Sequence, residues 1–140
     1  MAIKFYKIVS PTFLTYNNAT GPITLPLTTE VPVASITQSV EAGQKLKIDY
    51  ALNIVATTTA NWSITFELRL YRDGTLINTR YYSRNGSQVG DQYIPMSSTY
   101  VESVPTSAVS STYALKAIVT AESNATAKTG ASINLNIITF

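Results

Sequence analysis

The sequence predicts an all-β protein built as an antiparallel sandwich of two sheets. Apolar and polar residues alternate with a period of two through most of the 140 residues, and no window shows the repeat of an amphipathic helix. The chain is rich in Ser, Thr, Val, Ile and Tyr, which suit strands and turns better than helices. Clusters of turn residues divide it into about six or seven strands, enough for a two-layer sandwich.

Residues 1–21 are expected to form an N-terminal arm and a flexible break, and residues 22–140 the sandwich domain. The arm is strongly apolar, and its anchoring side chains would be Ile3, Phe5, Ile8, Phe13 and Leu14. A polar stretch, residues 17–21, follows it. Two interpretations remain open: a first strand of the same sandwich, or a donor strand that adds to a neighbouring subunit.

The clearest strand spans residues 45–56, after a turn at residues 41–44 that contains Gly43. Its alternate residues form one apolar face, predicted to be buried: Leu46, Ile48, Tyr50, Leu52, Ile54 and Ala56. Before it, residues 22–32 contain three prolines and are expected to form an edge strand or connector, because proline donates no hydrogen bond to a sheet. Residues 33–40 follow as a strand.

A hairpin is predicted around Asp73 and Gly74, a sequence that favours a two-residue type I′ turn. With these two as the loop, the predicted pairs are Tyr71 with Leu76, Leu70 with Ile77, Glu67 with Arg80, and Phe66 with Tyr81. The inner face would hold Trp62, Ile64, Phe66, Leu68 and Leu70. The outer face would present a contact patch for another protein, formed by Arg69, Tyr71, Arg80 and Tyr82.

Three further strands are predicted at residues 92–96, 112–121 and 132–140. The second of them would bury Tyr113, Leu115, Ala117, Val119 and Ala121. The third would bury Ile133, Leu135 and Ile137.

Composition argues against most chemistry. The chain contains no His and no Cys, which removes His-based triads, His/Cys zinc sites and disulfides, so no catalytic residue, metal or cofactor is predicted. Only 13% of residues are charged and the net charge is +2, so no nucleic-acid partner is expected. No apolar run is long enough for membrane insertion. The first residues, interrupted by Lys4 and Lys7, form no recognisable secretory signal.

The aromatic residues leave one binding alternative open. Trp62, Tyr71, Tyr81, Tyr82 and Tyr93 could line a sugar-stacking surface, although aromatic residues in strands more often pack in a core or an interface. A carbohydrate-binding module with a surface glycan as partner is therefore kept as an alternative; a host receptor would be the partner of a receptor-binding trimer.

Residues 40–50, 68–74 and 113–117, together with the closing residues 133–140, resemble the small jelly-roll domains of Bacillus-type spore-surface and phage structural proteins. Those domains are similar to the tumour-necrosis-factor/C1q fold. The resemblance runs from Val33 to Phe140 and implies jelly-roll topology, no catalytic residues, and self-association as trimers or filaments. The chain lacks the collagen-like stalk of the spore proteins and the cysteines of spore-appendage subunits.

The function predicted from these observations is that of a non-enzymatic structural subunit. It would assemble with copies of itself through β-strand contacts into a surface fibre, an appendage, or the exterior of a spore or particle. A phage decoration protein or receptor-binding trimer is the first alternative, and the carbohydrate-binding module is the second.

Overall fold

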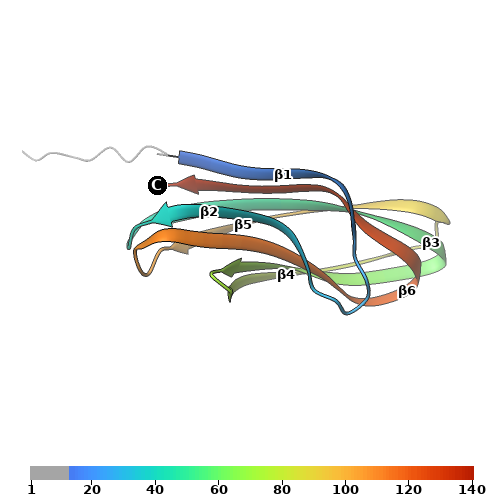
Figure 1. Cartoon of the computed structure of the whole chain (residues 1–140). Helices are drawn as coiled ribbons and strands as arrows, with labels where there is room; N and C mark the ends of the chain where they lie inside the picture. The colour runs from blue at the N-terminus through green and yellow to red at the C-terminus, as the bar shows by residue number, and fades with distance from the viewer. Residues whose placement is uncertain (1–12) are drawn as a thin grey trace, which may run out of the picture.

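The computed structural model describes the backbone of residues 13–140, and side chains from residue 23 onward except residue 127 (Figure 1). Six strands make up this part of the chain: β1 (Phe13–Thr24), β2 (Val31–Val40), β3 (Lys45–Arg72), β4 (Thr75–Gly86), β5 (Gly90–Ser103) and β6 (Ala108–Thr139). All pairs between these strands are antiparallel. The predicted all-β class is confirmed.

Two long strands, β3 and β6, run through both layers of the sandwich. The first part of β3, residues 45–58, pairs with β5, whereas the second part, residues 62–72, pairs with β4. Likewise the first part of β6, residues 108–117, pairs with β2, and the second part, residues 129–139, pairs with β1. One sheet therefore has the order β1–β6–β3–β5 and the other the order β2–β6–β3–β4. Two four-stranded sheets connected in this way form a jelly roll, as the sequence predicted.

Each long strand bends at an asparagine, at the end of the molecule opposite the C-terminus (Figure 1). Asn61 in β3 and Asn124 in β6 have φ angles of 59° and 53°, a left-handed conformation that asparagine tolerates better than most residues. The Asn124 amide donates hydrogen bonds to the carbonyls of Ala60 and Asn61, at 3.0 and 3.2 Å. The predicted breaks between residues 56 and 62 and between 121 and 132 are thus bends within continuous strands.

The core lies between the sheets and contains nearly every apolar side chain that the alternation predicted. In β3 the buried residues are Leu46, Ile48, Tyr50, Leu52, Ile54, Ala56, Trp62, Ile64, Phe66, Leu68 and Leu70. In β6 they include Tyr113, Leu115, Ala117, Val119, Ile133, Leu135 and Ile137. Each large side chain contributes about 1.5–3 kcal/mol by leaving water. Ala121 is an exception: it was predicted to be buried but is exposed, because the β3–β6 register shifts between Thr65 and Phe66.

The β3–β4 hairpin has the predicted turn but a different register. Asp73 and Gly74 both have positive φ angles, 47° and 81°, and Tyr71 faces Leu76 as expected. Ile77 is then an extra residue on β4, so Asn78 faces Leu70. Every later pair moves by one position.

The predicted pairs beyond the bulge are therefore wrong. Glu67 faces Tyr81 rather than Arg80, and Phe66 faces Tyr82 rather than Tyr81. Since a shift of one residue turns each side chain to the opposite face, Arg80 and Tyr82 exchange faces with Tyr81.

The first described strand belongs to the sheet of its own chain. Phe13 and Leu14 of the predicted arm lie in β1, where their backbone faces Thr139 and Ile138 of β6. The predicted flexible break, residues 17–21, also lies within β1, so the predicted boundary at residue 21 falls inside a strand. The other arm residues, Ile3, Phe5 and Ile8, lie outside the described residues.

Candidate functional site

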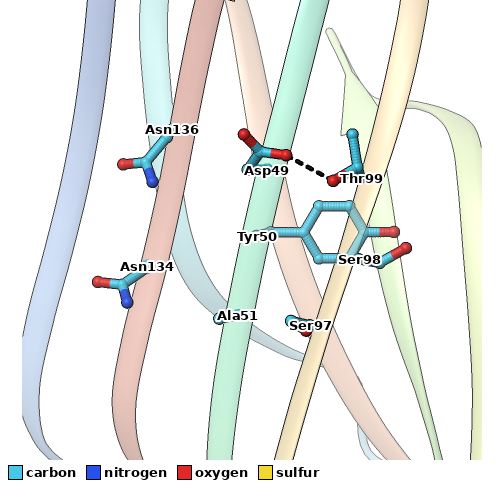
Figure 2. Close-up of a pocket in the computed structure, with 8 residues that line it drawn as sticks. All are labelled: Asp49, Tyr50, Ala51, Ser97, Ser98, Thr99, Asn134 and Asn136. Carbon is cyan, nitrogen blue, oxygen red and sulfur yellow. Dashed lines mark hydrogen bonds between the residues drawn. The ribbon is translucent and has the colours of Figure 1, made fainter.

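A shallow hollow of about 230 Å³ lies on the outer face of the β1–β6–β3–β5 sheet (Figure 2). Its floor is Ala51 on β3, which faces Asn134 of β6 on one side and Ser97 of β5 on the other. In the next outward-facing row, Asp49 lies between Asn136 and Thr99. The hollow exists because the small Ala51 side chain is surrounded by longer ones, and the two asparagine amides lean away from it (Figure 2).

The side chains around the hollow offer hydrogen-bonding groups. The Asp49 carboxylate accepts a hydrogen bond from the Thr99 hydroxyl at 2.5 Å and lies 3.4 Å from the Lys47 ammonium group. Among the side chains that the structure describes, the Asn134 and Asn136 amides have no hydrogen-bond partner. A fixed carboxylate, two amides and the Ser97 hydroxyl thus form a polar surface without a strong net charge.

A charged cluster occupies the outer face of the other sheet. Arg69 donates to Glu30 at 2.7 Å and to Glu67 at 2.8 Å, and the Tyr71 hydroxyl donates to Glu30 at 2.7 Å. The Lys116 ammonium group lies 4.5 Å from the centre of the Tyr71 ring, in a cation–π contact. The hydrogen bond from Tyr71, assisted by Arg69 and Lys116, lowers the pKa of the Glu30 carboxyl, and that same bond raises the pKa of Tyr71.

Replacing Glu30 with glutamine should destabilise the protein at neutral pH, and the difference from wild type should shrink as pH falls. The pKa of Glu30 is below its ordinary value of 4.5 in the folded state, so its carboxylate stabilises the fold above that pH. This stabilisation is lost as pH falls through the folded pKa. Urea unfolding of both proteins from neutral pH to about pH 3 measures it. Tyr71→Phe, which removes the main donor, should reproduce part of the loss; a difference that does not vary with pH would contradict the prediction.

The structure does not bring the four residues of the predicted contact patch together, because the bulge at Ile77 turns Arg80 and Tyr82 to the opposite face from Arg69 and Tyr71. Arg69 and Tyr71 belong to the charged cluster. Arg80 instead donates to the Ser98 hydroxyl at 2.8 Å, and the Tyr82 hydroxyl donates to the Ser97 carbonyl at 2.9 Å. Arg80 and Tyr82 thus link β4, an edge strand of one sheet, to β5, an edge strand of the other. The Tyr82 ring stacks on Phe66 with a centroid distance of 5.5 Å.

Two ion pairs each have one buried partner, and no local sequence pattern predicts either of them. Glu102 on β5 is 4% exposed; it pairs with Arg72 and accepts a hydrogen bond of 2.7 Å from the Tyr113 hydroxyl. Burial raises the pKa of Tyr113. Near the strand bends, the buried Lys128 pairs with Glu122. Within the described residues no group of three or more His, Cys, Asp or Glu side chains could hold a metal ion.

The chain is a jelly-roll domain by its fold. The outer faces of its sheets are polar, and most of their polar groups form hydrogen bonds or ion pairs with one another. No protein-family model and no curated protein matches the chain. In the described part of the chain, no helix has the length and apolar character needed to cross a membrane.

Solved structures with a similar fold are known. The VP2 subviral particle of infectious bursal disease virus matches 99% of this chain and 37% of that chain, with a TM-score of 0.51 and 12% identity. Dimeric latent PorU from Porphyromonas gingivalis matches 89% of this chain and 12% of that chain, with a TM-score of 0.50 and 10% identity. The chain thus spans about a third of the first protein and about an eighth of the second, and at these identities the likeness concerns the fold alone.

Proposed function

We propose that the chain is a non-enzymatic structural subunit that associates with copies of itself through β-strand contacts, on the exterior of a particle or in a surface fibre. The observation that carries this proposal is the exposed edge strand β4. The subviral particle of infectious bursal disease virus is built from a protein with a similar fold, which agrees with the proposal without testing it.

Three of the four edge strands contain a proline, which opposes strand addition. β1 contains Pro22, β2 contains Pro32 and β5 contains Pro95, and proline offers no N–H group to an added strand. β4 contains no proline, and within the described residues it pairs with β3 alone. Its other edge makes no backbone pair with the described residues and contacts β5 through the Arg80 and Tyr82 side chains, so its backbone is the best suited of the four to accept another strand.

The side chains of β4 also favour a protein contact. Tyr81 is 73% exposed and Leu76 is 48% exposed, although both are large and apolar enough to gain from burial. Tyrosine is enriched at protein interfaces because it provides a large apolar area together with a polar end. Arg80, which could oppose an incoming basic strand, is held by its hydrogen bond to Ser98.

The N-terminal segment of a neighbouring copy is the strand that we propose to occupy this edge. It contains the apolar Ile3, Phe5 and Ile8 and joins the sheet at Phe13, which faces Thr139 near the C-terminus. A segment of this length can span about 40 Å when extended, enough to reach an adjacent molecule.

Deleting residues 1–12 and, separately, replacing Tyr81 with lysine should each convert an oligomer into a folded monomer. A lysine at this position places a solvated charge on the edge, which opposes pairing without disturbing the core. Light scattering and electron microscopy measure assembly, and circular dichroism verifies the fold.

Tyr93→Lys is the matched control, since Tyr93 is equally exposed but lies on β5 together with Pro95; this variant should assemble normally. A wild-type chain that stays monomeric at high concentration, or both variants assembling like wild type, would refute the proposal.

A further inference from the structure

We infer that the hollow over Ala51, together with the exposed ring of Tyr93, forms a binding site for a neutral oligosaccharide. The inference does not depend on the self-association proposed above, because the hollow lies on the outer face of the sheet that contains β5, whereas strand addition would use the backbone edge of β4. Arg80 and Tyr82 of β4 contact Ser98 and Ser97 at the rim of the hollow, so the two sites are neighbours.

The dimensions of the hollow suit one sugar ring. It extends from Asn134 on β6 across Ala51 to Ser97 on β5, which is two strand spacings or about 10 Å. Its floor is the methyl group of Ala51 and the neighbouring backbone, including that of Tyr50, which is buried. A ring of sugar size can therefore lie flat on the sheet between side chains of β5 and β6.

The polar groups match sugar hydroxyls, each of which both donates and accepts. The Asp49 carboxylate is a strong acceptor, and Thr99 fixes its position at 2.5 Å. The Asn134 and Asn136 amides lean away from the hollow (Figure 2), and a change of side-chain rotamer would turn their donors and acceptors toward a sugar on the opposite side. Because Lys47 balances the charge of Asp49, the site favours a neutral ligand over an anionic one.

Tyr93 extends the site along β5. It is 74% exposed and lies on the same face of the strand as Ser97, because the intervening Ile94 and Met96 point into the core. Ser97 lies four positions after Tyr93, or about 13 Å along the strand, so a chain of several linked sugar units is needed to reach both. An exposed tyrosine ring can stack on the apolar face of such a unit while a second unit occupies the hollow.

Titration with neutral trisaccharides tests the inference. The probes are α- and β-linked glucose, β-linked N-acetylglucosamine and α-linked mannose trisaccharides, followed by NMR chemical shifts. At least one should bind the wild-type chain. Ala51→Leu fills the hollow from its solvent side and should weaken that binding by about tenfold or more. Tyr93→Ala and Asn134→Ala should weaken it as well, with unchanged circular dichroism.

Tyr81→Ala is the control, because it removes an equally exposed tyrosine from the other sheet and should leave sugar binding unchanged. The inference is overturned if none of the trisaccharides binds, or if Ala51→Leu and Asn134→Ala bind as well as wild type. Loss of assembly in Tyr81→Lys with sugar binding retained would separate this site from the self-association contact.

Discussion

Replacing Arg72 with methionine should lower the free energy of unfolding by about 3–5 kcal/mol. Arg72 is the cationic partner of Glu102, a residue of β5 that is only 4% exposed. Without the guanidinium group, Glu102 keeps the 2.7 Å hydrogen bond from Tyr113 but has no opposite charge among the described side chains. A buried carboxylate in this situation must either remain uncompensated or take up a proton, and both outcomes cost stability. Urea denaturation at neutral pH measures the loss.

Two further variants show whether the loss comes from the buried charge. Combining Arg72→Met with Glu102→Leu should recover part of the stability, because an apolar pair can replace a buried ion pair at little cost, whereas the Tyr113 hydroxyl loses its acceptor. Lys47→Met, which breaks the more exposed pair with Asp49, should cost less than about 1 kcal/mol. An Arg72→Met variant as stable as Lys47→Met would show that the interior pair contributes nothing.

Replacing Asn124 with valine should destabilise the protein by about 3 kcal/mol. Asn124 adopts a φ angle of 53°, where a β-branched residue is strained by at least about 1–2 kcal/mol. The substitution also removes both hydrogen bonds to the carbonyls of Ala60 and Asn61, each worth about 1 kcal/mol. Thermal and urea unfolding measure the change.

Asn124→Gly separates these two contributions. Glycine adopts the left-handed conformation without strain, so this variant should lose only the hydrogen bonds and be clearly more stable than Asn124→Val. Equal losses in the two variants would mean that backbone strain at the bend is unimportant.

The buried faces could be predicted from the sequence because they depend only on local alternation. Leu46 to Ala56 and Trp62 to Leu70 each place every second side chain in the core, as expected. The type I′ turn was also predictable, since Asp-Gly favours it intrinsically. These features require no knowledge of which strand lies beside which.

Features that depend on register could not be predicted in the same way. The bulge at Ile77 has no glycine or proline to indicate it, yet it moves Tyr82 onto Phe66 and leaves Tyr81 exposed. The hollow was missed for a related reason: Asp49, Asn134 and Ser97 come together only when β3, β5 and β6 are aligned. The pairing of Arg72 with Glu102 joins residues on different sheets and gives no local signal.

Because β3 and β6 continue through both sheets, unfolding of one sheet affects the other. The two central strands of each sheet are parts of β3 and β6. Unfolding one sheet would therefore break the backbone hydrogen bonds that support the other. We therefore expect the two sheets to unfold as a single cooperative unit, with partial unfolding limited to the outer strands β1, β2, β4 and β5.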